Sequence, residues 1–448
     1  MAIDEWSLNV MMEELAQAYL ARAADKAPGG CDEARANGTP SKGRALNIRT
    51  SIKRLSMLQV LEPSGGGSGR HFLDLCRAMQ HRGHSVTAVY SPVRAEPAFV
   101  RELEGIGLDR VVPVAMRRAP GPWDITAWKH LRKIASKQGP FDLIHGHSSK
   151  AGALTRLRLP GKHTPVLYTP HAFRTMDPTL GSKGRLIYGG IERLLGNWLT
   201  DQLICVSRDE YNHALSLGIS EDRLRIVVNG VNAPPNSQRA AIRKRYGIPQ
   251  DALLFGFVGR MTRQKAPERL VEAFIRIASE MPHAHLLMIG TGELADVVTD
   301  MIRSAGLEKR VYLDGSIPGV TAIEAFDVVV MPSRYEAMSY VMLEAAAAGK
   351  PLLLADVGGA RTVLEHGRNG YIVPNSDDPR ELAGTMARLA DPKLLASLTA
   401  EARSRKDSYT LTGMADATEQ IYYDLLGYPV PAPLARPESI RPQNAAAY

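Results

Sequence analysis

The sequence contains only three cysteines in 448 residues, Cys31, Cys76 and Cys205. They are odd in number and lie far apart, which argues against a disulfide framework and against a zinc site built on thiolates. So few thiols are typical of a protein from a reducing compartment. We therefore expect a cytoplasmic protein and exclude the small, disulfide-rich secreted classes.

Long apolar runs are also missing, since no segment reaches the roughly 18–20 apolar residues that a membrane-spanning helix needs. The first residues carry Asp4, Glu5, Glu13 and Glu14 instead of a basic segment followed by an apolar stretch, so we expect no signal peptide. Aromatic residues make up only 6%, too few for a base-stacking platform, and no nucleic-acid-binding motif is visible. We expect no nucleic-acid partner.

Charge is unbalanced toward the basic side, with a formal net charge of +8. Lysine and arginine gather at residues 49–54, 129–137 and 150–162. A basic surface attracts phosphate-bearing substrates and anionic lipid headgroups. The alternative is a solvated basic face without a function, and both interpretations stay open.

The chain is long enough for two domains with separate cores. Short apolar runs alternate with helical patterns, which is typical of a doubly wound parallel sheet. The pattern breaks at Asn232-Ala-Pro-Pro-Asn236 and then starts again. The expected units are a disordered extension at 1–50, a first α/β domain at 51–236, a second at 237–409, a last helix at 410–426 and a flexible tail at 427–448.

Functional loops are expected between the two domains. In open α/β sheets the ligand binds beyond the carboxyl ends of the strands. Two such domains that face one another would therefore direct their strand-end loops into a shared cleft.

Two glutamates mark the end of one apolar strand of the second domain. Glu336 follows the strand 328–331, and Glu344 lies within a helix expected at 338–348. Eight residues along a helix place two side chains about 80° apart around its axis. We predict that Glu336 meets a sugar and that the more buried Glu344 reaches a ribose hydroxyl. The alternative is a first-turn glutamate favoured by the helix dipole and a second, solvated one.

A second loop of the same domain carries two cations. Gly259 and Arg260 follow the strand 253–258, and Lys265 precedes the next helix. Two cations and nearby helix N–H groups can neutralise a diphosphate, a task that a divalent metal performs in other proteins. We therefore expect no metal here, while two exposed cations without a function remain the alternative. Gly290 closes a neighbouring strand and would expose its backbone at the same sheet edge.

The first domain offers a glycine loop and three histidines at strand ends. Gly66 lies within Gly65-Gly-Gly-Ser-Gly69, which can bring backbone N–H groups close to an anion but is not a Walker A loop. His145, His147 and His171 each sit where a strand ends and can orient a hydroxyl or a developing charge. The alternatives are structural histidines, or a metal hydrolase in which these three side chains are ligands.

Together these motifs resemble the retaining glycosyltransferases of family 4, the group 1 enzymes with the GT-B architecture. Glu336 and Glu344 match the family's paired glutamates, and His171 matches the histidine near the reacting sugar. The similarity spans roughly residues 55–426. Three further segments resemble motifs of the family. Gly259–Lys265 resembles its diphosphate-binding loop, and Gly65–Gly67 followed by Arg70 resembles its N-terminal glycine loop. Asn229–Val231 resembles the segment just before its interdomain linker.

The resemblance implies an α/β fold of two Rossmann-like domains, the first binding the acceptor and completed by helix 410–426, the second binding a nucleotide sugar. It implies that Arg260 and Lys265 hold the donor diphosphate, that Glu336 contacts the sugar, and that no metal or other cofactor takes part. The catalytic set is then His171, Glu336, Arg260 and Lys265. The donor-binding set is Gly66, Gly259, Arg260, Lys265, Gly290, Glu336, Met338, Ser339 and Glu344.

The implied reaction is metal-independent transfer of a hexose, with retention, from a nucleotide-diphosphate sugar to a glycan or a polyprenyl-diphosphate-linked acceptor. Such a step would serve cell-envelope or exopolysaccharide synthesis, with peripheral contact to anionic lipid at the inner face of the plasma membrane. Two departures from the family keep an alternative open, a non-catalytic nucleotide-sugar-binding component of a glycan-assembly complex. Ala337-Met338-Ser339 stands where many members have Gly-Phe-Gly, and Thr362 where many have glutamate.

Overall fold

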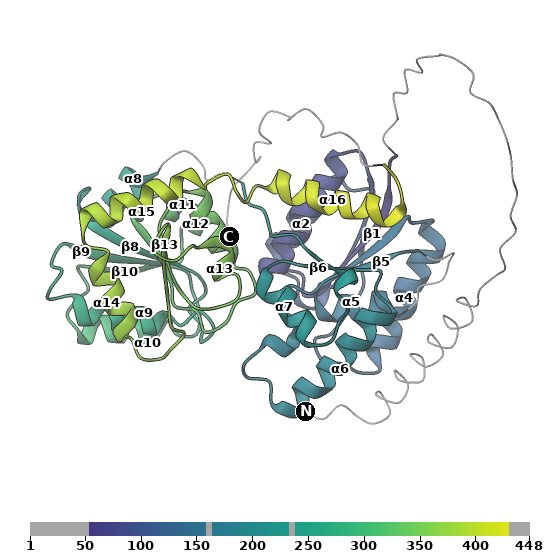
Figure 1. The fold of residues 1–448 in the computed structure, drawn as a ribbon, viewed down its shortest axis with the longest axis horizontal. Helices are drawn as coiled ribbons and strands as arrows, with labels where there is room; N and C mark the ends of the chain where they lie inside the picture. Colours follow the sequence, from purple (N-terminus) through teal and green to yellow (C-terminus); the bar gives the residue numbers. More distant parts are fainter. Residues whose placement is uncertain (1–52, 158–163, 233–237, 430–448) are drawn as a thin grey trace, which may run out of the picture.

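A computed structural model describes residues 53–157, 164–232 and 238–429. The described chain forms two α/β halves, each built on one parallel sheet (Figure 1). The expected disordered extension at 1–50 and residues 430–448 of the expected tail lie outside the described residues. None of the described helices combines the length and apolarity needed to cross a bilayer.

The first half is a seven-stranded sheet in the order β3-β2-β1-β4-β5-β6-β7. All neighbouring strands are parallel, and the central ones are buried on both faces, as a sheet covered by helices on both sides requires. The strands are β1 (Ser56–Leu61), β2 (Ser85–Tyr90), β3 (Arg110–Pro113), β4 (Leu143–His147), β5 (Val166–Thr169), β6 (Gln202–Cys205) and β7 (Leu224–Ile226).

Helices follow the strands of this sheet and bury their apolar faces on it. Cys76 and Cys205, the two cysteines that the structure describes, are free thiols inside this core. The helices are α2 (Gly66–His81), α3 (Pro97–Gly105), α4 (Trp123–Gln138), α5 (Ser148–Arg156), α6 (Ser182–Trp198) and α7 (Arg208–Ser216), with short 3-10 turns at Pro92–Arg94, Arg174–Met176 and Glu221–Arg223.

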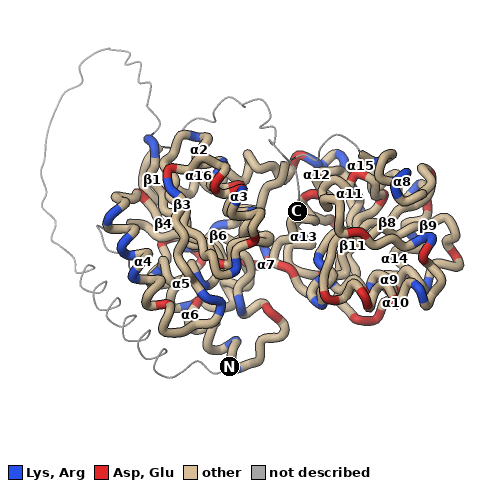
Figure 2. Tube along the Cα trace, turned by 180° about the vertical axis from the view of Figure 1, so that it is seen from behind, with Lys and Arg blue, Asp and Glu red and all other residues tan. Residues whose placement is uncertain are grey.

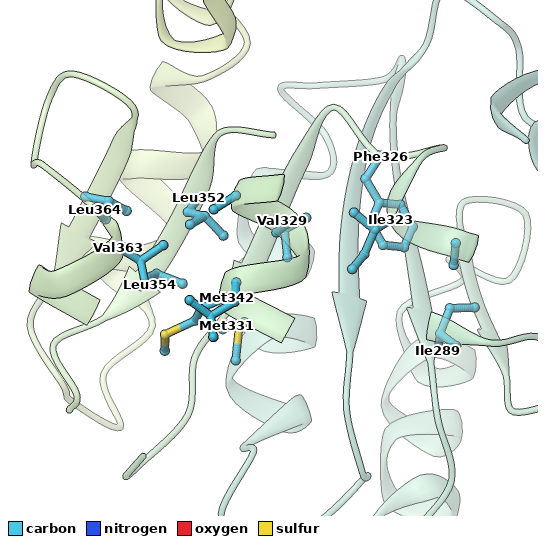
Figure 3. Packing of buried hydrophobic residues seen from close by; sticks show 14 of the residues in the cluster. Ile289, Ile323, Phe326, Val329, Met331, Met342, Leu352, Leu354, Val363 and Leu364 are labelled. Carbon is cyan, nitrogen blue, oxygen red and sulfur yellow. The ribbon is translucent and has the colours of Figure 1, made fainter. Parts of the chain in front are cut away.

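The second half is a six-stranded parallel sheet in the order β10-β9-β8-β11-β12-β13. Figure 3 shows Met342 close to Met331 and Leu354 of this sheet, and Phe326 beside Ile323, all within one buried apolar cluster. The strands are β8 (Leu253–Val258), β9 (Ala284–Ile289), β10 (Val311–Asp314), β11 (Val328–Met331), β12 (Leu352–Ala355) and β13 (Gly370–Val373).

The helices of the second half cover both faces of its sheet. The prediction of two doubly wound parallel sheets is therefore confirmed. The helices are α8 (Arg239–Arg245), α9 (Pro267–Ile277), α10 (Ala295–Ser304), α11 (Gly319–Ile323), α12 (Tyr340–Ala347), α13 (Ala360–Val363), α14 (Arg380–Arg388) and α15 (Pro392–Ser404).

The last helix, α16 (Leu411–Leu426), leaves the second half and packs on the first. Its Tyr422 and Tyr423 are buried among the side chains of β1 and α2. The two chain segments that link the halves lie side by side, since Val231 N donates to Tyr409 O at 2.9 Å. In Figure 1 α16 accordingly lies beside α2, far from α15 that precedes it in the chain.

Candidate active site

Loops that follow the strands of both sheets meet between the halves. Gly359 N, at the start of α13, donates to Asp209 Oδ2 of α7 at 2.8 Å, and Figure 1 shows these two helices side by side. A β-carbon placed on Gly67 would lie 3.7 Å from the ring of Tyr340 in α12. The glycine loop of the first half therefore abuts the helix that carries Glu344.

The structure brings Lys265 and Glu336 into direct contact. Lys265 Nζ donates to Glu336 Oε1 at 2.6 Å, and the two side chains are only 13% and 7% exposed. Their loops are joined by two further bonds, from Gln264 Nε2 to Tyr335 O and from Arg334 N to Gln264 O. The cation of one predicted motif thus neutralises the carboxylate of the other.

Arg260 lies in the loop between β8 and Lys265, and its side chain is exposed. Among the described residues, none makes a hydrogen bond or an ion pair with its guanidinium. A charged, unengaged group at the end of β8 is ready to bind an anion.

Glycine at position 290 lets two of these loops touch. Gly290 has a φ of +143°, and a β-carbon there would lie 2.0 Å from Gly259 O. No other residue fits this contact, because real β-carbons do not approach a backbone oxygen so closely. Gly290 therefore holds the β9 loop against the Arg260 loop.

The helix after Glu336 begins later than the sequence predicted. Ser339 has extended dihedrals and α12 starts at Tyr340, so the predicted start at Met338 is wrong. Glu336 lies outside the helix, and the 80° relation to Glu344 does not apply. The extra loop exists because Met338, which is buried, packs against Gly359.

Glu344 is half-buried in α12, near the guanidinium of Arg70 from the first half. Burial raises the pKa of its carboxyl to about 7, although the charge of Arg70 partly opposes this shift. Asp74, which pairs with Arg70 at 2.7 Å, raises the pKa further. A group with this pKa changes its charge close to neutral pH.

The raised pKa of Glu344 predicts a pH-dependent effect of Glu344→Gln on stability. The folded protein holds this proton more tightly than the unfolded chain, whose carboxyl keeps its ordinary pKa of 4.5, so ionisation costs stability as pH rises from about 4.5 to 7. The variant should be more stable than the wild type by about 3 kcal/mol near pH 8. The difference should largely vanish near pH 4.5. Urea unfolding of both proteins at these pH values measures it, and a pH-independent difference would contradict the assignment.

His171 follows β5 in a strained backbone. Its φ is +54° and that of Ala172 is +90°, a region that non-glycine residues rarely adopt. Glu210 of α7 secures the turn, because its carboxylate accepts from Ala172 N and from Val206 N, both at 2.7 Å. Among the described residues, no hydrogen bond or ion pair joins His171 to Glu336 or Lys265.

The histidines that lie close enough to bind a metal together are not the three that the sequence suggested. The two ring nitrogens of His145 contact Tyr422 Oη and Thr169 Oγ1, at 2.8 and 2.9 Å, so His145 has no nitrogen left for a metal and its place in that set is wrong. In the described chain, the group with metal-like spacing is His71, His147 and His171, whose ligand atoms lie within 4.8 Å of one another.

Of the three predicted basic clusters, the structure describes one completely. The predicted cluster at 129–137 lies on the exposed face of α4, where Figure 2 shows a row of Lys and Arg. Most of the cluster at 49–54 lies outside the described residues. Part of the cluster at 150–162 does so as well.

Comparison with known proteins gives two family matches. The sequence model described as Glycosyl transferases group 1 matches residues 238–405, and the one described as Glycosyltransferase Family 4 matches residues 65–235. Between them they cover both sheets.

Two of the similar sequences are bacterial enzymes. A UDP-Gal:alpha-D-GlcNAc-diphosphoundecaprenol alpha-1,3-galactosyltransferase of Escherichia coli is 26% identical over 70% of this chain and 83% of its own length. A D-inositol 3-phosphate glycosyltransferase of Xylanimonas cellulosilytica is 29% identical over 82% of this chain and 96% of its own length.

Solved structures share the fold. Anabaena HepE in complex with UDP superposes with a TM-score of 0.70 at 19% identity, over 83% of this chain and 100% of that one. Sucrose-phosphate synthase of Thermosynechococcus elongatus gives a TM-score of 0.69 at 22% identity, over 84% of this chain and 100% of that one.

Proposed function

Because the chain belongs to the group 1 glycosyltransferases of the GT-B fold, we propose that it moves a hexosyl group from a nucleotide-diphosphate sugar to an acceptor hydroxyl, with retention of configuration and without a metal ion. The contact between Lys265 and Glu336 at 2.6 Å carries this proposal, because a cation that could bind a diphosphate and a carboxylate that could bind sugar hydroxyls lie together at the strand ends of one sheet.

The proposed mechanism begins with an exchange of partners. Donor diphosphate takes the ammonium of Lys265 away from Glu336 and also pairs with Arg260. Glu336 is then free to accept hydrogen bonds from sugar hydroxyls, and Glu344 to accept them from the ribose. The donor thus uses both members of an ion pair that already exists.

Bond cleavage places negative charge on the leaving phosphate, where Lys265 and Arg260 stabilise it. The acceptor hydroxyl attacks the anomeric carbon from the face that the diphosphate leaves. A leaving phosphate oxygen takes the hydroxyl proton, so configuration is retained. His171 contacts the sugar as a neutral group, because burial keeps the pKa of its imidazole well below the ordinary value.

Candidate substrates follow from the relatives. The Escherichia coli relative is named for UDP-Gal and a diphosphoundecaprenol acceptor, and the Xylanimonas relative for inositol 3-phosphate. We propose a uridine diphosphate hexose as donor and a lipid-linked diphosphate glycan as acceptor, as in cell-envelope or exopolysaccharide synthesis.

The direct test mixes purified protein with UDP-hexoses and either acceptor class, and follows the product by mass spectrometry and NMR. We expect transfer with the donor's own anomeric configuration. An inverted product would refute retention. Donor binding without turnover on every acceptor would favour the non-catalytic alternative.

A lipid-linked acceptor requires access to a bilayer, and α6 offers a suitable surface. Leu186 is 79% exposed and Trp198 is 49% exposed. The one acidic residue of α6, Glu192, is buried against Arg156, so the outer face carries basic charge only. Exposed apolar and basic side chains on one helix fit an anionic membrane surface. The exposed basic residues of α6 are Lys183, Arg185 and Arg193.

Leu186→Ser is expected to weaken co-sedimentation with phosphatidylglycerol vesicles about tenfold, because the serine loses the apolar transfer energy of a leucine. Val297→Ser on α10, where the valine is also 49% exposed, is the matched control and should bind like the wild type. Equal binding of the wild type and both variants would remove α6 from the proposed membrane contact at the cytoplasmic face. Binding to neutral vesicles as strong as binding to phosphatidylglycerol vesicles would do the same.

A further inference from the structure

We propose that a buried hydrogen-bond chain from Tyr422 through Gln59 and His147 holds His171 in one tautomer, with its proton on Nε2. The chain makes Tyr422, Gln59 and His147 positioning residues for the transfer reaction. This catalytic consequence rests on the proposed function, whereas the tautomer itself does not.

The orientation of the Gln59 side chain sets the direction of the chain. Gln59 is fully buried in β1. Its Nε2 lies 3.1 Å from Tyr422 Oη and 3.4 Å from Met57 Sδ, both of which can accept hydrogen bonds. A flipped amide would place its oxygen against the lone pairs of Met57 Sδ and lose that hydrogen bond, whereas the present orientation lets Nε2 donate to both acceptors. The amide oxygen therefore faces His147.

The protons then follow from residue to residue. His147 Nε2 lies 2.9 Å from Gln59 Oε1 and must donate to it, so His147 Nδ1 carries a lone pair. That nitrogen faces His171 Nε2 at 3.3 Å. Burial keeps both imidazoles neutral, because it holds their pKa well below the ordinary value. The proton between them consequently belongs to His171 Nε2, and His171 Nδ1 is left as the acceptor.

Tyr422 also directs a second branch. Since its hydroxyl accepts from Gln59, it donates to His145 Nδ1 at 2.8 Å. His145 Nε2 then donates to Thr169 Oγ1 at 2.9 Å. The Tyr422 hydroxyl on α16 thereby fixes the proton positions of His145 and His147 on β4. Through His147 it also fixes the proton of His171 after β5.

His171 is held at both its backbone and its ring. Glu210 secures the strained backbone at Ala172, while the ring bonds to His147 and packs edge-on against His71 with centroids 4.6 Å apart. His71 in turn faces Asn229 Oδ1 through Nδ1 at 2.9 Å. A side chain so constrained presents one fixed acceptor, Nδ1, to a sugar hydroxyl.

The chain is incompatible with a metal at His71, His147 and His171. A metal between His147 Nδ1 and His171 Nε2 needs a lone pair on both nitrogens, whereas the chain places a proton on the second. Zinc binding and the hydrogen-bond chain are therefore alternatives that one spectrum separates.

Long-range proton–nitrogen NMR of histidine-labelled full-length protein reads the tautomers without any substrate. We expect the Nε2–H form for His145, His147 and His171, and the Nδ1–H form for His71. The Nδ1–H form of His171, or zinc bound in a one-to-one ratio with loss of the His171 Nε2 proton, would overturn the proposal. The predicted tautomers together with no turnover of any nucleotide sugar would leave the chain standing and reject the proposed function.

Tyr422→Phe tests the positioning role, because it removes one hydroxyl from the chain and keeps the buried ring. We expect kcat to fall roughly three- to tenfold with the donor KM unchanged, and the His147 and His171 signals to broaden by tautomer exchange. Tyr423→Phe is the matched control, since that neighbouring hydroxyl donates to Lys53 O outside the chain. Identical kinetics and spectra for both variants would refute the role of Tyr422.

Gln59→Glu provides a readout that a structural role would not move. A carboxylate in place of the amide oxygen favours the protonated imidazole and raises the pKa of His147. We expect turnover to decline on the acidic side of its pH profile in the variant only, since a charged His147 no longer accepts from His171. If the pH profile of turnover in Gln59→Glu matches that of the wild type, the proposed hydrogen-bond chain is contradicted.

Discussion

Lys265→Ala is expected to lower kcat for sugar transfer by about 10²–10³. Lys265 stabilises the charge that develops on the leaving diphosphate, and its loss also leaves Glu336 unpaired beside the phosphates. Donor KM should therefore rise as well, because an uncompensated carboxylate repels the diphosphate. Steady-state kinetics with a saturating acceptor measure both constants.

Arg239→Ala is the matched control for this variant. It breaks another ion pair of the same half, from Arg239 to Asp327 at 2.8 Å, which lies at the opposite end of the β strands. We expect wild-type kinetics from it. If Lys265→Ala behaves like this control, Lys265 does not act on the leaving group.

Glu336→Gln should also lower kcat by at least about 10², but with the opposite effect on donor binding. The amide no longer neutralises Lys265, which leaves the ammonium free for the diphosphate, so donor affinity should hold or increase. The hydrogen bonds to the sugar weaken, because a charged acceptor binds hydroxyls more strongly than a neutral one. Calorimetric titration of the donor, combined with kinetics, separates the two effects.

The double variant Lys265→Ala/Glu336→Gln tests whether the two side chains act as a pair. It should bind the donor more tightly than Lys265→Ala alone, because the unpaired carboxylate is gone. Glu272→Gln, on α9 where Glu272 pairs with Arg276 at 3.6 Å, controls for the loss of one carboxylate. Additive effects of the two site variants on donor binding would show that the observed ion pair has no part in binding the donor.

The sequence was sufficient to predict the doubly wound sheets, because the strands at their centres are continuous apolar runs. It missed the strands β3 and β7 at the sheet edges. Arg110–Pro113 is only partly buried and Leu224–Ile226 has three residues, so neither carries the apolar pattern of a central strand. Edge strands owe their structure to pairing with a neighbour more than to their own composition.

The candidate site was predicted at the level of motifs but not of contacts. Lys265 and Glu336 were singled out separately, and their ion pair spans 71 residues, a closeness that only tertiary packing creates. The late start of α12 depends likewise on Met338 packing against Gly359. The hydrogen-bond chain from Tyr422 to His171 was missed because its members lie on β1, β4, α16 and the loop after β5. Gln59 gave the available signal, as a lone amide within the apolar run Met57–Leu61.

The decisive measurement is donor affinity by calorimetry in excess EDTA and again with added magnesium. If Arg260 and Lys265 neutralise the diphosphate, both titrations should give the same dissociation constant, and transfer should proceed at the same rate in both buffers. Loss of donor binding and of transfer in EDTA, with recovery on adding magnesium, would contradict a diphosphate site built from protein cations.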